Sequence, residues 1–162
     1  MAPAGSVTAR LQELGLALPP VAAPVASYVP AVVSGAWVHT SGQLPLVDGA
    51  LPATGKVGAA VDPQLAQDLA RTCCLNALAA VQAQIGSLDR ITRVVKLTGY
   101  VASDPSFSGQ PAVINGASDL LGQLFGEAGA HARSAVGVAV LPLDAPVELD
   151  LVVEFDPAAA EA

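Results

Sequence analysis

The sequence predicts an α+β fold: a mixed β-sheet with two long helices packed on one face, preceded by a shorter N-terminal helix. Two observations support this prediction. Alternating apolar residues, which are typical of strands, mark two pairs of strands, one pair within 27–41 and the other within 132–155, near the two ends of the chain. Between these pairs, two stretches of helical periodicity, 63–85 and 111–125, flank one further strand at 91–102. The resulting order is β-β-α-β-α-β-β, which favours a sheet covered by helices on one face.

The N-terminal region is predicted to be a helix followed by an extended connector. Residues 6–16 have the apolar spacing of a helix, and Gly15 is a typical stop. The prolines over 18–24 then favour extended structure, because each proline disfavours helix in the residue before it. We therefore divide the chain into residues 1–25, a main domain over 26–156, and an Ala-rich tail over 157–162 that we expect to be frayed.

The first strand pair, 27–33 and 36–41, is joined at Ser34-Gly35, a hairpin signal. A second turn is predicted at Asp48-Gly49, before a glycine-punctuated loop over 51–61. Asp62-Pro63 then begins the first long helix, which Gly86 ends, because Asp is a good N-cap and Pro suits the first helical position. Gly126 ends the second long helix.

The strand at 91–102 is predicted to alternate, with Ile91, Arg93, Val95 and Leu97 on one face. The last two strands, 132–142 and 147–155, are predicted to form a closing hairpin. On the final strand one face is apolar, and Glu148, Asp150 and Glu154 lie on the other.

Composition limits the class of function. The 162 residues suit one domain, and 52% hydrophobic with 13% charged residues indicates a folded chain with some surface buried against another subunit. The net charge of -7 argues against nonspecific binding to nucleic acid or to anionic membranes. The sequence has no signal-peptide pattern and no apolar run long enough to span a bilayer, so we expect no membrane association and a cytoplasmic location.

Few side chains suit catalysis. Cys73 and Cys74 are adjacent, which suits neither a disulfide nor a metal site, and we interpret them as buried helical residues. His39 and His131 lack metal-ligand spacing, and we interpret them as structural or surface residues. Arg133 stands beside small residues and can hold a carboxylate with two hydrogen bonds, although a salt bridge to an acidic residue is the alternative.

Three segments resemble a known family. They are Ala132-Arg133-Ser134-Ala135-Val136-Gly137-Val138-Ala139-Val140-Leu141-Pro142 with Val147-Glu148-Leu149-Asp150, Gly35-Ala36-Trp37-Val38-His39-Thr40-Ser41-Gly42-Gln43-Leu44-Pro45, and Asn115 within Ala112-Val113-Ile114-Asn115. In this order, over roughly residues 26 to 155, they resemble the reactive intermediate deaminase family (RidA/YjgF), also labelled endoribonuclease L-PSP-like. The resemblance implies the chorismate-mutase-like fold and a homotrimer with ligand clefts between subunits.

The resemblance also implies a reaction, the hydrolytic deamination of small 2-imino acids to 2-keto acids and ammonia, with no cofactor and no metal. Arg133 would bind the substrate carboxylate, and Glu148, fifteen positions later, would orient the attacking water. Main-chain groups of Ser134 and Ala135 would assist catalysis. The implied substrate-binding residues are Arg133, Asn115, Tyr28, Ser41 and Gly42, with Tyr28 closing the cleft from a neighbouring subunit.

From the residues alone, Glu148 is equally explained as a solvated strand residue, Asn115 as a surface residue and Tyr28 as an interface residue. The chain also departs from the family pattern at three positions, because Ala132, Ala135 and Gly137 stand where many members have Pro, Cys and Glu. The Gly137 substitution and the added N-terminal helix indicate a divergent subgroup. The alternatives to a deaminase are a non-catalytic protein that binds small carboxylates and, less favoured by the net charge, an endoribonuclease or translation inhibitor.

Overall fold

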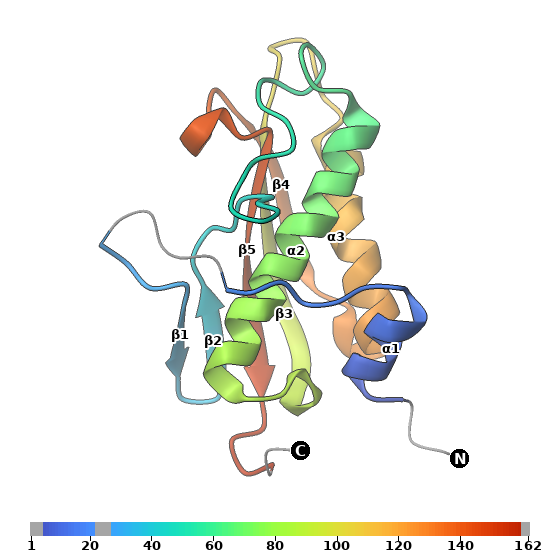
Figure 1. The fold of residues 1–162 in the computed structure, drawn as a ribbon, viewed down its shortest axis with the longest axis vertical. Coiled ribbons are helices and arrows are strands. Elements are labelled where there is room, and N and C mark those ends of the chain that lie inside the picture. The colour runs from blue at the N-terminus through green and yellow to red at the C-terminus, as the bar shows by residue number, and fades with distance from the viewer. Residues whose placement is uncertain (1–4, 22–26, 160–162) are drawn as a thin grey trace.

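The computed structural model describes residues 5–21 and 27–159, so part of the predicted connector, including Pro24, and the end of the predicted tail lie outside the described residues. Figure 1 shows one sheet with helices packed against it, which confirms the predicted α+β class. The helices and strands are α1 (Val7–Glu13), β1 (Ala31–Ser34), β2 (Trp37–Thr40), α2 (Pro63–Ile85), β3 (Ile91–Ala102), α3 (Gln110–Phe125), β4 (Ala132–Val138) and β5 (Val147–Phe155). Three short 3-10 turns are η1 (Leu88–Arg90), η2 (Gly126–Gly129) and η3 (Pro142–Asp144).

The five strands form a mixed sheet in the order β1-β2-β5-β3-β4. Neighbours are antiparallel except β3 and β4, which are parallel. The predicted closing hairpin is therefore wrong, because β4 pairs with β3 and β5 lies between β2 and β3. The reason is the connection: α3 carries the chain from the end of β3 back to its start, as a crossover between parallel strands requires.

Local signals set the bounds of α2. The Asp62 carboxylate accepts a hydrogen bond of 2.8 Å from the Gln64 backbone N–H, and Gly86 ends the helix at φ 81°. Both bounds agree with the prediction. The hairpin at Ser34-Gly35 and the turn at Asp48-Gly49 are also present, with Gly35 and Gly49 at φ 61° and 80°.

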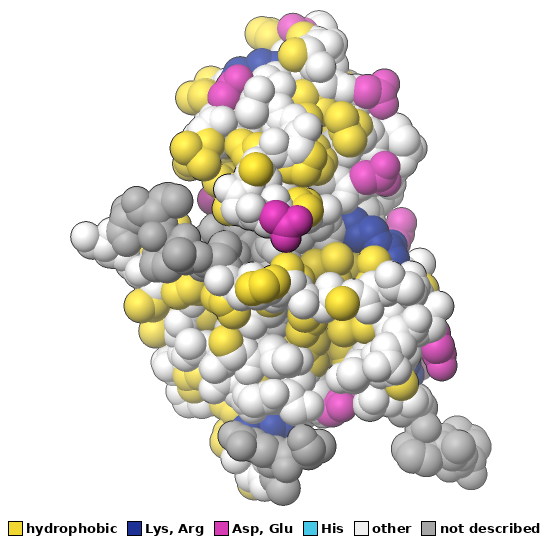
Figure 2. Space-filling view, viewed as in Figure 1, with side chains coloured by type: hydrophobic (Ala, Val, Ile, Leu, Met, Phe, Trp, Pro, Cys, Tyr) yellow, Lys and Arg dark blue, Asp and Glu magenta, His cyan; other side chains and the backbone are white. Residues whose placement is uncertain are grey.

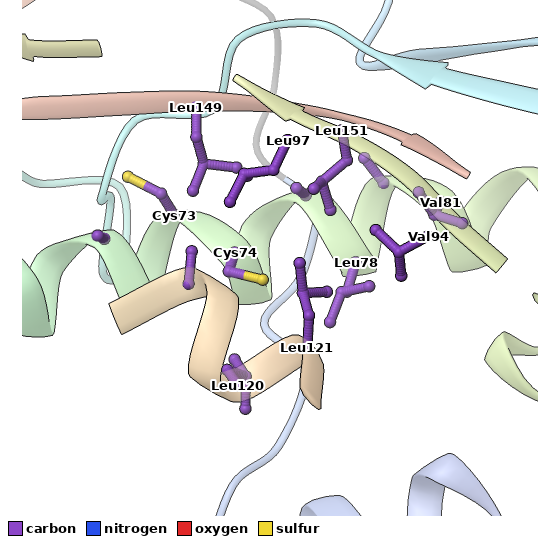
Figure 3. Close-up of a cluster of buried hydrophobic side chains, with 14 of the residues drawn as sticks. Cys73, Cys74, Leu78, Val81, Val94, Leu97, Leu120, Leu121, Leu149 and Leu151 are labelled. Carbon is purple, nitrogen blue, oxygen red and sulfur yellow. The ribbon is translucent and has the colours of Figure 1, made fainter. Parts of the chain in front are cut away.

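The core lies between the sheet and the helices. α2 packs on β5 and β2, α3 on β3 and β4, and α1 on α3. Figure 3 shows Leu97, Leu149 and Leu151 pointing from the strands toward α2 and α3. The same cluster holds Cys73 and Cys74, both fully buried, as predicted.

The predicted alternation along β3 is wrong at its start. Ile91, Val94 and Leu97 are buried while Arg93 is exposed, so the inward positions are three residues apart rather than two. Register shifts between Ile91 and Arg93 and between Val94 and Lys96 cause this spacing, because each irregularity turns the following side chains to the opposite face. β4 is also shorter than predicted, since its partner β3 ends at Ala102, opposite Val138.

Gly116 brings α3 into backbone contact with α2. A Cβ atom at this position would overlap the carbonyl oxygen of Gln67, whereas a Cβ at Gly122, on the same helix, would meet nothing within 4 Å. We expect Gly116→Ala to lower the free energy of unfolding by about 1–3 kcal/mol, because the backbone cannot yield as a flexible side chain does. Gly122→Ala, the matched control, should raise it by up to about 1 kcal/mol. Urea denaturation of both variants measures these changes, and a shift of the same sign in both would contradict this account.

Candidate functional site

Arg133 faces the helix-bearing side of the sheet. It pairs with Leu97 on β3, which pairs on its other side with Leu151, and both leucines are fully buried against the helices. Paired residues on neighbouring strands share a face, so the Arg133 side chain lies beside α3. There its Nη1 donates hydrogen bonds to Asn115 Oδ1 at 2.8 Å and to Ser118 Oγ at 3.2 Å.

The remaining guanidinium donors of Arg133 have no acceptor among the described residues. Within the described residues the ion pair that forms joins Lys56 to Asp144 at 2.7 Å, so Arg133 has no carboxylate of that part of the chain as a partner. The same residues supply no acceptor for its Nε or Nη2. A guanidinium has five N–H donors, and the Nε and Nη2 pair matches the two oxygens of a carboxylate.

Two residues near Arg133 had no site role in the sequence analysis. Ser118 lies one helical turn after Asn115, and its hydroxyl is 2.9 Å from His131 Nε2. His131 Nδ1 in turn donates to the Gly129 carbonyl oxygen at 2.6 Å. The i, i+3 spacing of Asn115 and Ser118 was the one local signal, because such residues share a helix face. We call Arg133, Asn115, Ser118 and His131 the arginine cluster.

Glu148 lies on the other side of the sheet. It pairs with Tyr100, whose parity on β3 is opposite to that of Leu97, so Glu148 faces away from the helices. A Cβ atom at Gly42 would overlap the Glu148 carboxylate, so the glycine leaves space for this side chain. Burial, and then the negative charge of Asp150, raise the pKa of the Glu148 carboxyl. Asp150 also accepts a hydrogen bond of 3.0 Å from the Tyr100 hydroxyl.

Ser41 precedes Gly42 and lies close in space to the backbone beside Tyr28. The Ser41 hydroxyl donates to the Val29 carbonyl oxygen at 2.6 Å, which ties it to the residue after Tyr28. The Tyr28 side chain is 44% exposed. We call Glu148, Gly42, Ser41 and Tyr28 the carboxylate cluster.

The segment through Gly42 is fixed by the backbone of Gln43 and by the buried side-chain amide of Asn76. Gln43 exchanges backbone hydrogen bonds of 2.7 and 3.1 Å with Leu149, which sets Gly42 beside Glu148. Asn76 of α2 donates to the carbonyl oxygens of Leu44 and Leu46 at 2.9 and 3.1 Å. Neither Gln43 nor Asn76 had a role in the sequence analysis, because these hydrogen bonds join segments that are distant in the chain.

The side chains of Ser134 and Ala135 lie on opposite faces of the sheet. The Ser134 hydroxyl accepts a hydrogen bond of 2.9 Å from Lys96 Nζ on the open face. Ala135 pairs with Gly99 on the helix-bearing face, one alternation beyond Arg133. The hydroxyl of Ser134 therefore points away from Arg133, which leaves main-chain groups as the contribution of this dipeptide near the guanidinium.

The two clusters do not meet within one chain. Arg133 and Glu148 lie on opposite faces, at β3 partners that are three residues apart, which corresponds to about 10 Å along the strand. Among the described residues, no group of His, Cys, Asp and Glu is arranged to hold a metal ion. No helix in the same part of the chain is long and apolar enough to cross a bilayer.

Residues 8–155 match the sequence model of the family described as "YjgF/chorismate_mutase-like, putative endoribonuclease". The chain belongs to this family. The resemblance and the fold proposed from the sequence are thereby confirmed, and the matched range includes most of α1.

The similarity to known relatives extends over almost the whole chain. Protein TCP17 of Trypanosoma cruzi is 50% identical over 153 residues, which cover 94% of this chain and 96% of that protein. The crystal structure of Atu1372 from Agrobacterium tumefaciens, a protein of unknown function, is 49% identical, covers 93% of this chain and 92% of its own, and has a TM-score of 0.87. Escherichia coli TdcF, solved with bound serine, is 31% identical. The match covers 86% of this chain and 94% of TdcF, with a TM-score of 0.59.

The raised pKa of Glu148 predicts a pH-dependent stability difference. Because the native state holds this proton more tightly than the unfolded chain does, ionising Glu148 lowers the free energy of unfolding as the pH rises above the carboxyl's ordinary value of 4.5. We expect Glu148→Gln to melt at a higher temperature than wild type at about pH 8, with the difference vanishing below about pH 4. Glu13→Gln, at an exposed position of α1, is the control. A difference of equal size at both pH values would contradict the assignment.

Proposed function

We propose that the protein is a hydrolytic deaminase of small 2-imino acids, which releases a 2-keto acid and ammonia. The observation that carries the proposal is the Arg133 guanidinium, held through Nη1 by Asn115 and Ser118, with Nε and Nη2 left for a ligand. The neighbouring Ala135 is small, which suits a short substrate. TdcF, which is 31% identical to this chain, was solved with bound serine, and a small ligand of that kind supports the choice of a short carboxylate.

The proposed reaction is a hydrolysis without a redox step. Water adds to the imine carbon while the Glu148 carboxylate accepts a proton from that water, and the Glu148 carboxyl then gives this proton to the imine nitrogen. In the tetrahedral intermediate Glu148 takes the hydroxyl proton and passes it to the amine nitrogen, the hydroxyl oxygen becomes the keto oxygen, and the C–N bond breaks to release ammonia. The raised pKa of the Glu148 carboxyl lies closer to neutral pH than that of an ordinary glutamate, and this makes the carboxylate a better base for the transfer. Arg133 supplies position and charge, which suffice because an imine carbon is already electrophilic.

The proposal requires a second copy of the chain. Arg133 and Glu148 face opposite sides of one sheet, so a substrate can touch both only at a boundary between subunits. The open face also carries exposed apolar side chains that favour such a boundary, Val32, Trp37 and Val136. We therefore propose a homotrimer, as the family resemblance implies, in which one subunit contributes the arginine cluster and its neighbour the carboxylate cluster.

An endoribonuclease, the activity named in the family description, fits this chain less well. RNA binding depends on neutralising phosphates, and the chain has a net charge of -7. Figure 2 shows acidic side chains spread over the face that carries the helices, with few basic ones.

Ammonia release from 2-aminoacrylate generated in situ tests the proposal. We expect the wild-type chain to accelerate release and Arg133→Ala to lose that acceleration by roughly a hundredfold, since a hydrogen-bonded charge pair is lost. Arg133→Lys should also be poor, because an ammonium does not hold a carboxylate with two parallel hydrogen bonds. Arg71→Ala is the matched control, because this arginine of α2 donates a hydrogen bond of 3.4 Å to Gln123 and belongs to neither cluster.

The assay separates two outcomes. Acceleration that Arg133→Ala abolishes and Arg71→Ala retains supports the deaminase. No acceleration in the wild-type chain, with a 2-keto acid still bound, would contradict it and would indicate a carboxylate-binding protein on the same fold.

A further inference from the structure

A chain of hydrogen bonds connects the backbone of η2 to the Arg133 guanidinium. It runs from the Gly129 carbonyl oxygen to His131 Nδ1 at 2.6 Å, and from His131 Nε2 to the Ser118 hydroxyl at 2.9 Å. Ser118 Oγ then accepts a hydrogen bond of 3.2 Å from Arg133 Nη1. This series of hydrogen bonds therefore links η2, α3 and β4.

For a neutral imidazole, the chemistry of the two end groups determines the direction of every bond. A carbonyl oxygen only accepts, so the imidazole proton must lie on His131 Nδ1. In neutral histidine the other nitrogen, Nε2, is then an acceptor, and the Ser118 hydroxyl donates to it. This donation turns the lone pairs of Ser118 Oγ toward Arg133, which has donors only.

Both ends of this series of hydrogen bonds, Gly129 and Arg133, are held in place by the fold. Gly129 is buried, and a Cβ atom there would overlap the Leu121 carbonyl oxygen, so η2 packs directly on the backbone of α3. At the other end, pairing with Leu97 fixes the backbone of Arg133. His131 is therefore held at a set distance from the guanidinium by elements that do not depend on a ligand.

We propose that His131, acting through Ser118, is a positioning residue for Arg133, an inference that rests on the proposed function for its role in catalysis. Asn115 and Ser118 together engage both hydrogens of Nη1, which orients the guanidinium plane and directs Nε and Nη2 toward a carboxylate. Without an acceptor at His131 Nε2, the Ser118 hydroxyl turns freely and no longer fixes one of these two bonds. The guanidinium then has to be ordered by the ligand itself, which weakens binding.

Three variants test this role, with pyruvate as the probe and titration calorimetry as the measurement. We expect His131→Leu and Ser118→Ala each to weaken pyruvate binding by about tenfold, the effect of losing one hydrogen bond to a charged group. His131→Gln should bind within about twofold of wild type, because its amide oxygen restores the acceptor that Ser118 needs. The double variant His131→Leu/Ser118→Ala should bind no more weakly than the weaker single variant, since both changes break the same connection.

Kinetics and spectroscopy separate positioning from a general structural effect. In the deaminase assay, His131→Leu should raise KM about tenfold and change kcat by less than about twofold, because His131 does not touch the reacting atoms. The ¹⁵N NMR spectrum of the wild-type imidazole should show a protonated Nδ1 and an unprotonated Nε2.

Several outcomes would overturn the inference. They are wild-type affinity for pyruvate in His131→Leu, equal loss of affinity in His131→Gln and His131→Leu, or an imidazole protonated on Nε2 alone. Wild-type pyruvate binding that falls in His131→Leu, with no ammonia release by any variant, would uphold the positioning role and refute the proposed reaction. A wild-type chain that neither binds pyruvate nor accelerates ammonia release would refute both.

Discussion

The parallel pairing of β4 with β3 decides which way each candidate side chain faces. Because Arg133 is in register with Leu97, the guanidinium lies on the helix-bearing side of the sheet, next to α3. β5 pairs with the other edge of β3, and its register sets Glu148 beside Tyr100 on the open side. A slip of one residue in either pairing would exchange the faces. The separation of the two clusters is therefore a property of the sheet, and the proposed sharing of a site between two subunits rests on it.

Glycines make the close contacts on which both clusters depend. Gly116 lets α3 approach the backbone of α2, and Gly129 lets η2 approach α3, so the helix that carries Asn115 is held from both sides. Gly42 has a different purpose, because its missing side chain leaves room for the Glu148 carboxylate. Each of these positions is explained by space and not by a special backbone angle, since none of the three has a positive φ.

The features predicted correctly from the sequence are those that residues close together in the chain determine. The bounds of α2 were correct because Asp62 and Gly86 act within one helical turn. The closing hairpin was wrong because strand pairing depends on the path of the chain through α3, which no local pattern encodes. The arginine was found from its position beside small residues and from the family resemblance. Its support by Ser118 and His131 was missed, since the latter contact joins a helix to a loop thirteen residues away.

Complementation between two inactive variants tests most directly the claim that one site is built from two subunits. Arg133→Ala and Glu148→Gln are unfolded together, refolded as an equal mixture and assayed for ammonia release. If each site takes its arginine from one subunit and its carboxylate from the next, the mixture should recover about a quarter of wild-type activity, the share of boundaries with both native residues. Each variant refolded alone should stay inactive. A mixture no more active than the variants alone would contradict a shared site.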